Sequence, residues 1–256
     1  MNMFNYFELL WQFITTDFKL RYKNSYLGII WIVLKPLAMF TVIYIIWSNI
    51  FKMDESFKMG LLLGIIMMNL FSEAIMMGMD SLMAKAGIIL KIKFPREVVV
   101  YSGVTIAMLD FFFNMIVFAI FCIFTPVNMT FLGLLLFLLA IACIFVLTLG
   151  ISLFSSIIFI KLRDIHNLVE VLIQLIFWAT PIYYTLDMLP ANLQQIIKIN
   201  PLTLIVTYAR KGLITGNEIR SEDFLQLGVV FLVCCLVLLL GNIFFKKRVS
   251  KIAEYF

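Results

Sequence analysis

Apolar runs long enough to cross a lipid bilayer recur along this chain and are separated by short charged segments. A membrane-spanning helix needs about 20 consecutive apolar residues. Runs near or beyond that length lie at 27–50, 59–79, 98–124, 131–160, 167–186 and 225–245. These runs are continuous, whereas a transmembrane barrel would show alternating strands of about ten residues. The pattern therefore predicts an all-α integral membrane protein with six transmembrane helices in a single domain, residues 1–256.

Residues 3–20 follow a different pattern, in which apolar side chains recur at spacings of three and four with polar side chains between them. This spacing predicts an amphipathic helix within the segment 1–26. We expect it to lie in the cytoplasmic interface of the membrane, with its apolar face in lipid or against the bundle. The alternative is a helix that simply covers the bundle.

The segment 185–224 is the longest stretch between two predicted spans on the external side. Pro190 and Pro201 divide it into two short apolar-periodic stretches at 189–199 and 202–214, each too short or too polar to cross the membrane alone. We predict a pair of re-entrant helices, which are tolerated at membrane depth when they are buried in protein or line a wet cavity. Gly212 and Gly216 are expected to end the second helix.

Composition and charge agree with a membrane protein and suggest its orientation. Hydrophobic residues make up 63% of the chain and charged residues 14%, against roughly 45–50% apolar residues in soluble domains. Thirteen of the 20 Lys and Arg residues lie on one side of the predicted spans, six lie on the other, and Lys35 lies within the first span. Because basic loops stay in the cytoplasm, both termini are predicted to be cytoplasmic. The net charge of +5 follows from this topology, so it does not indicate a nucleic-acid partner.

The sequence offers little for catalysis or metal binding. The four cysteines lie inside apolar runs without CxxC spacing, and His166 is the only histidine. We therefore expect the cysteines to be packing residues and predict no metal site, catalytic residue or cofactor on this chain. A GxxxxGK[ST] phosphate-binding loop is absent from the sequence. Any ATP-driven work would need ATP and magnesium on a partner subunit.

Polar side chains inside the predicted spans are the candidates for function. Asp110 and Asn114 lie four residues apart on one face of the third span, and an intramembrane carboxylate commonly faces a cavity or a partner. The alternative is an interhelical hydrogen-bonded pair that involves Glu73.

The fifth span carries a second group of candidates. Glu170, Gln174 and Trp178 recur every four residues and would share one helix face, and Pro181 would bend the helix just before Tyr183 and Tyr184. Interfacial aromatic residues also serve as membrane anchors, which is the alternative interpretation. The complete predicted substrate path consists of Asp110, Asn114, Glu170, Gln174, Trp178, Tyr183 and Tyr184.

Two predicted cytoplasmic segments, 80–97 and 161–166, would both be accessible to a soluble motor protein. The first is too long for a minimal turn and is expected to form a short helix before Pro95 interrupts it. The residues predicted to couple to such a partner are Lys91, Lys93, Phe94, Pro95, Arg96, Glu97, Arg163 and Asp164.

Four segments resemble a known family: LRYKNSYLGIIWIVLKP at the first span, LKIKFPRE after the second, RDI followed by ATPIYY around the fifth, and INPLTLIVTYARKGLITG. They are similar to the permease subunits of type 2 ABC exporters for polysaccharides, in particular the O-antigen and teichoic-acid permeases, in the same order along nearly the whole chain. The resemblance implies a channel formed by two permease copies and driven by two nucleotide-binding ATPase subunits. It also implies that KFPRE and RD contact those subunits, and that an undecaprenyl-linked glycan is exported across the bacterial inner membrane.

Two other transport functions remain as alternatives. One is an ABC permease for a drug or another small amphiphile. The other is an ion-coupled secondary transporter, in which Asp110, Glu73 and Glu170 would be proton or sodium sites. The lack of an obvious inverted repeat counts against the second. A membrane enzyme has little support, because the sequence shows no nucleophile–base constellation.

Overall fold

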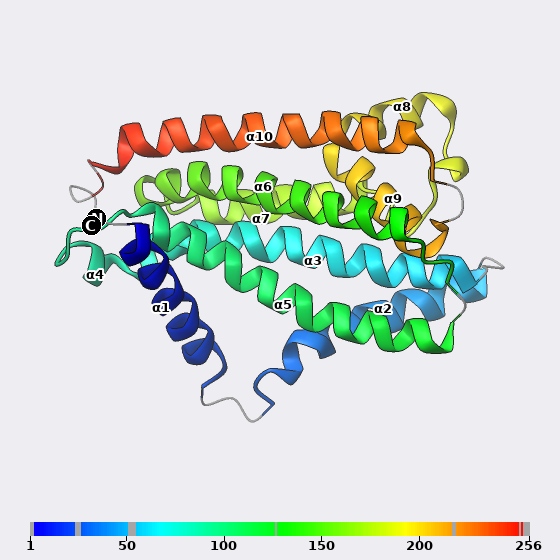
Figure 1. The fold of residues 1–256 in the computed structure, drawn as a ribbon, viewed down its shortest axis with the longest axis horizontal. Helices are drawn as coiled ribbons and strands as arrows, with labels where there is room; N and C mark the ends of the chain where they lie inside the picture. Colours follow the sequence, from blue (N-terminus) through cyan, green and yellow to red (C-terminus); the bar gives the residue numbers. More distant parts are fainter. Residues whose placement is uncertain are drawn as a thin grey trace.

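The computed structural model describes residues 3–23, 27–50, 55–125, 127–216, 219–250 and 252. Within these ranges the chain is helical except for turns, loops and one isolated parallel bridge between Asn128 and Thr215. The elements, shown in Figure 1, are α1 (Met3–Tyr22), α2 (Ile30–Ile50), α3 (Glu55–Ala84), α4 (Ala86–Ile89), α5 (Glu97–Phe124), α6 (Phe131–Lys161), α7 (Ile165–Ala179), η1 (Leu186–Met188), α8 (Ala191–Ile199), α9 (Pro201–Ile214) and α10 (Ser221–Val249).

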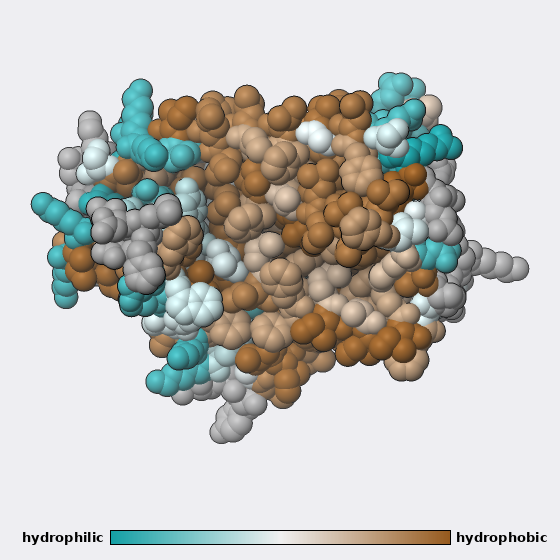
Figure 2. Space-filling model, in the orientation of Figure 1, coloured by the Kyte–Doolittle hydropathy of each residue, from teal (hydrophilic) through white to brown (hydrophobic). Residues whose placement is uncertain are grey.

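Five of the described helices, α2, α3, α5, α6 and α10, are long and apolar enough to cross a membrane. They run roughly along the long axis of the molecule (Figure 1). Apolar side chains cover the middle of the face seen in Figure 2, and hydrophilic side chains gather at its two ends. This distribution is that of a multi-pass membrane protein. The start of α1, α4, the turn between α6 and α7 and the end of α10 lie at one end of the bundle, and α8 and α9 lie at the other (Figure 1).

The fifth predicted span, 167–186, is wrong in its extent. Helix α7 has 15 residues and ends at Ala179. At 1.5 Å per residue it is about 22 Å long, shorter than the roughly 30 Å hydrocarbon core. Thr180 is extended, with φ −94° and ψ 133°, because a proline disfavours helical geometry in the residue before it. Pro181 therefore ends this helix early.

Helix α3 is the centre of the bundle. In its most apolar stretch 78% of the residues are buried, compared with 22% in α2 and in α10. The helix continues to Ala84, beyond the predicted span of 59–79, so Asp80 lies on a helix instead of opening a loop. The short helix expected before Pro95 is present as α4.

Glycine pairs allow the backbones of α6, α9 and α10 to touch. A Cβ atom on Gly133 of α6 would lie 2.1 Å from the carbonyl oxygen of Gly212 in α9, and one on Gly241 of α10 would lie 2.4 Å from the carbonyl oxygen of Gly150 in α6. The prediction that Gly212 ends its helix is wrong, because α9 continues to Ile214. Gly212 serves close helix packing instead.

Helix α1 packs beside α5 and runs obliquely to the other helices at the α4 end of the bundle (Figure 1), so the helix expected at 3–20 is present. Its inward side includes Ile14, which is buried, whereas Phe7 and Trp11 are exposed. The Lys85 ammonium donates hydrogen bonds to the Asp17 carboxylate and, at 3.2 Å, to Ser102 Oγ. These contacts join α1 to the end of α3 and the first turns of α5. The helices expected at 189–199 and 202–214 are present as α8 and α9.

Candidate functional site

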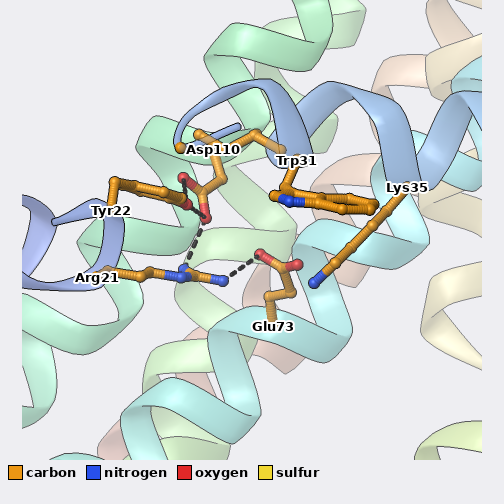
Figure 3. A pocket seen from close by; sticks show the side chains of 8 residues that line it. Arg21, Tyr22, Trp31, Lys35, Glu73 and Asp110 are labelled. Atoms are coloured by element: carbon orange, nitrogen blue, oxygen red, sulfur yellow. Dashed lines mark hydrogen bonds and ion pairs between the residues drawn. The ribbon is translucent and has the colours of Figure 1, made fainter. Parts of the chain in front are cut away.

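Arg21 in the last turn of α1 is the centre of a charged cluster that joins three helices (Figure 3). Its Nη1 atom lies 2.7 Å from Oδ2 of Asp110, in the middle of α5. Its Nη2 atom lies 3.7 Å from Oε2 of Glu73 on α3. The Asp110 side chain is only 5% exposed, and a buried carboxylate requires such a partner because desolvation of an unpaired charge is costly. One guanidinium therefore holds two carboxylates from different helices.

Tyr22 completes the coordination of Asp110. Its hydroxyl donates to the carboxylate, with distances of 3.0 Å to Oδ1 and 3.2 Å to Oδ2. Burial, followed by the nearby charge of Asp110, raises the pKa of the Tyr22 hydroxyl above its usual value. The hydroxyl thus keeps its proton and remains a donor at neutral pH. Both oxygens of Asp110 are engaged by the end of α1.

A cavity of about 360 Å³ lies beside this cluster and is lined by Arg21, Glu73, Asp110, Trp31 and Lys35, among others. Figure 3 shows the Lys35 side chain extending toward Glu73, with the Trp31 ring between Lys35 and the Asp110 side. The four ionisable groups carry two positive and two negative formal charges. The cavity therefore contains charges of both signs that cancel formally.

Asn114 does not form the interhelical hydrogen bond that was the alternative expectation. Its Nδ2 atom donates to the backbone oxygen of Asp110 on the same helix, at 2.9 Å. Asn114 lines a neighbouring cavity of about 250 Å³ together with Lys35, Glu73 and Phe177. The charged side chains of α5 and α3, Asp110 and Glu73, are instead joined through Arg21.

Sequence reasoning missed Arg21 and Tyr22. Both residues belong to the LRY triplet at the end of the amphipathic pattern of the first helix, and Arg21 precedes Asp110 by 89 residues. A charged residue at such a position is ordinary for a helix end in water, so nothing local marked Arg21 as the partner of an intramembrane carboxylate.

The α7 candidates form a separate group on an exposed face. None of the α7 residues is buried; Glu170, Gln174 and Trp178 follow one another at four-residue spacing on this helix, and all three are exposed. Tyr183 differs, because its side chain is 2% exposed and packs against the rings of Phe177 and Trp178 at centroid distances of 5.1 and 5.5 Å.

Tyr184 is half-buried, and its hydroxyl donates to the carbonyl oxygen of Trp178 at 3.3 Å. The predicted path residues therefore occupy two places. Asp110 and Asn114 are buried beneath the start of α2, and the α7 residues lie on the outer side of their helix. Phe177 connects the two places, because it lines the same inner cavity as Asn114.

The predicted coupling residues lie at one end of the bundle, in the connection from α4 to α5 and in the turn between α6 and α7 (Figure 1). Lys91, Lys93, Arg163 and Asp164 are exposed; Phe94, Pro95, Arg96 and Glu97 are half-buried.

Two long-range contacts anchor these segments. Arg96 Nη1 donates to the carbonyl oxygen of Val249 at the end of α10. His166 Nε2 lies 3.5 Å from Oδ2 of Asp80, which joins the start of α7 to the end of α3. The exposed charges thus lie on segments that are held against the bundle by these contacts.

The cluster does not favour an ion-coupled transporter. A coupling cation would sit between carboxylates such as Asp110 and Glu73. In the structure the Arg21 guanidinium already occupies that position. Two of the three carboxylates proposed for that alternative, Asp110 and Glu73, are therefore paired with an arginine of the chain itself, and the third, Glu170, is exposed on α7.

Comparison with known proteins agrees with this arrangement. Residues 8–214 match the family model described as ABC-2 type transporter. The chain is 28% identical over 252 residues to an O-antigen export system permease protein RfbA of Klebsiella pneumoniae, covering 97% of this chain and 95% of that protein. It is 21% identical over 265 residues to the protein of the same name from Myxococcus xanthus, covering 98% and 96%. The chain therefore belongs to the ABC-2 type transporter family, as a permease subunit similar along nearly its whole length to those of O-antigen export systems.

Proposed function

We propose that this chain is the channel-forming permease subunit of an ATP-driven exporter that moves a lipid-linked polysaccharide across the bacterial inner membrane. The full-length similarity to O-antigen export permeases supports this substrate class. The chain itself is a transport subunit and not an ATPase. In the proposed complex two copies of the chain form the channel, and two ATPase subunits bind ATP and magnesium.

The observation that carries this proposal is the outer face of α7. The helix has no buried residue, yet its exposed side combines Glu170 and Gln174 with the indole of Trp178, which is 59% exposed. A carboxylate that faces lipid costs about 3 kcal/mol on the insertion scale. A second copy of the chain and a hydrated path between the copies would remove that cost.

This arrangement suits a carbohydrate polymer. Each sugar hydroxyl that enters an apolar medium without a partner costs several kcal/mol. Polar groups such as Glu170 and Gln174 would accept or donate hydrogen bonds to those hydroxyls, and the Trp178 ring would contact the apolar C–H faces of successive sugars. Contacts of this kind do not require one register, so a polymer can slide over them.

The proposed topology has six crossings. Helix α7 and the turn after it would form the fifth of these crossings, and α8 and α9 would form an external re-entrant pair. The exposed Phe7 and Trp11 would place α1 in the cytoplasmic interface. The excess of Lys and Arg at the α4 end favours cytoplasmic termini. The Arg21 cluster would hold α1 against α3 and α5 while the ATPase acts at the same end.

Export by the reconstituted complex tests this function. We expect Trp178→Ala to lower ATP-dependent export of a lipid-linked glycan about tenfold without reducing assembly with the ATPase, and Trp178→Leu not to restore it, because leucine has no ring face. The measurement is glycan delivered per ATP hydrolysed in proteoliposomes. Normal export by the alanine variant would place the path on other helices. Transport of small amphiphiles but not of the glycan would favour the alternative substrate class.

Charge reversal in the α6–α7 turn tests the docking of the ATPase. We expect Arg163→Glu to weaken ATPase binding about tenfold, because the substitution reverses an exposed charge at the proposed interface. Membrane insertion should be normal, since exposed charges contribute little to stability. Lys198→Glu, an equivalent reversal on α8 at the opposite end, is the control and should bind the ATPase normally. Equal binding by both variants would contradict the assignment of this turn.

A further inference from the structure

The side chain of Arg210 on α9 bridges two other parts of the chain. Its Nε atom donates to the carbonyl oxygen of Gly60 on α3 at 2.9 Å. Its Nη1 and Nη2 atoms donate to the carbonyl oxygens of Pro181 and Ile182, in the turn after α7, at 2.6 and 2.8 Å. One planar guanidinium thus holds three carbonyl groups from two segments, a geometry that a lysine ammonium does not reproduce.

Two glycines on α3 make room for this guanidinium. Gly60 and Gly64 lie one helical turn apart, in a GxxxG pattern that in membrane helices commonly allows another helix to approach closely. A Cβ atom on Gly64 would lie 2.5 Å from Arg210 Nη2 and 3.2 Å from Ile182 Cγ2. A Cβ atom on Gly60 would be at least 3.5 Å from Arg210, which is an ordinary contact. The pattern therefore forms a groove for an arginine side chain.

The turn after α7 is fixed to α9 at a second point. Asn200, the N-cap of α9, donates from Nδ2 to the hydroxyl of Thr180 at 3.1 Å. The backbone between Thr180 and Ile182 is thus joined to both the start and the third turn of α9. Its two carbonyl groups have no helix to satisfy them, so the loss of Arg210 would leave them to find other partners.

This turn leads directly into the aromatic residues of the proposed path. Tyr184 follows Ile182 by two residues and contacts Trp178 through its hydroxyl. Arg210, Pro181 and Tyr184 also line a cavity of about 670 Å³ at the α8–α9 end of the bundle. A shift of the turn relative to α3 would therefore move both the aromatic side chains and one wall of this cavity.

We infer that Arg210 is a positioning residue for transport, which sets the place of the aromatic turn at the external end of the path by clamping it to α3 and α9. This inference rests on the proposed export function. Arg210 does not need to touch the glycan to act in this way. It should affect how fast the polymer leaves, while recognition of the lipid-linked substrate at the cytoplasmic end stays the same.

The experiment uses the complete transporter with its native cysteines replaced and a reporter cysteine at Thr185, which lines the same cavity. The test variants are Arg210→Gln, which removes the clamp, and Gly64→Ala, which keeps the charge but displaces the guanidinium. The controls are Lys211→Gln, which breaks only the pair with Asp223, and Gly60→Ala. Thiol labelling by a membrane-impermeant maleimide is measured separately from export.

We expect both test variants to change the labelling rate at position 185 about tenfold and to lower the maximal export rate by a similar factor. The apparent affinity for the lipid-linked glycan should stay within about twofold of the parent, and Arg210→Lys should not restore the parent labelling rate. Both controls should label like the parent.

Parent-like labelling in Arg210→Gln and Gly64→Ala would overturn the clamp. Altered labelling with normal export would overturn its role in transport. An apparent affinity for the lipid-linked glycan that falls as much as the maximal export rate would also overturn this role, because Arg210 would then act in substrate recognition. If Arg210→Gln does not assemble, Gly64→Ala still decides, because it keeps the arginine and adds a single methyl group that contacts the guanidinium and Ile182. If the parent transporter itself does not export the glycan, the proposed function fails. The labelling rates still show in that case whether Arg210 fixes the position of the turn.

Discussion

Replacing Arg21 with methionine is expected to lower the free energy of unfolding by about 3–5 kcal/mol, because it leaves the buried carboxylate of Asp110 without its charge partner. The methionine keeps most of the apolar volume of the arginine stem, so the loss reports mainly on charge. Tyr22 would still donate one hydrogen bond to Asp110, which is not sufficient to offset the desolvation of the anion. Thermal or denaturant unfolding of the purified protein in nanodiscs measures the effect.

A second substitution makes this test specific. Asp110→Asn removes the negative charge, so the double variant Arg21→Met/Asp110→Asn should recover about half or more of the lost stability. Lys19→Met is the matched control, because Lys19 is an exposed cation on the same helix and should change stability by less than about 0.5 kcal/mol. If the double variant is as unstable as Arg21→Met, the arginine stabilises α1 through packing and not through Asp110.

The second large effect is expected at the contact between α6 and α10. Gly241→Ala would place a Cβ atom 2.4 Å from the carbonyl oxygen of Gly150 and 3.1 Å from its carbonyl carbon. Since neither backbone can move without separating the two helices, we expect a loss of about 1–3 kcal/mol in unfolding free energy. The unfolding of the same nanodisc preparation measures it.

Gly228→Ala, on the same helix, is the opposite case. Apart from the neighbouring backbone of its own helix, a Cβ atom at Gly228 would have no heavy atom within 4 Å. Alanine is favoured over glycine inside a helix by about 0.5–1 kcal/mol, so this variant should be neutral or slightly more stable. Equal effects at positions 228 and 241 would mean that helix propensity, and not the glycine contact, controls stability here.

The membrane character and most of the helices follow from local pattern alone. Uninterrupted apolar runs need helices to satisfy their backbone groups in lipid, and this is why α2, α3, α5, α6 and α10 lie where the apolar runs predict. The periodic pattern of residues 3–20 and the prolines at 190 and 201 likewise predicted α1, α8 and α9. Pro181 was recognised as a breaker, yet the run after it was apolar enough to be counted within the fifth span.

The charged cluster shows the limit of that reasoning. Asp110 was recognised as a candidate, since a carboxylate in an apolar run is costly wherever it lies. Its partner Arg21 was not, because hydrophobic periodicity shows which face of a helix is buried but not which helices are neighbours. The same applies to Gly212, whose backbone contact with Gly133 depends on how α6 crosses α9.

Arg210 illustrates the physical reason most directly. A basic residue in a polar external segment looks like an ordinary solvated charge, and a GxxxG pattern looks like a helix-packing motif. In the structure the basic side chain of Arg210 binds three carbonyl groups from α3 and from the turn after α7, and the glycines make room for it. These groups come together only when the chain folds, because Gly60 and Pro181 lie 150 and 29 residues before Arg210. Local sequence determines which residues prefer lipid and which backbone becomes helical, whereas the partners of buried charges depend on packing between distant helices, for which a pattern along the chain carries no signal.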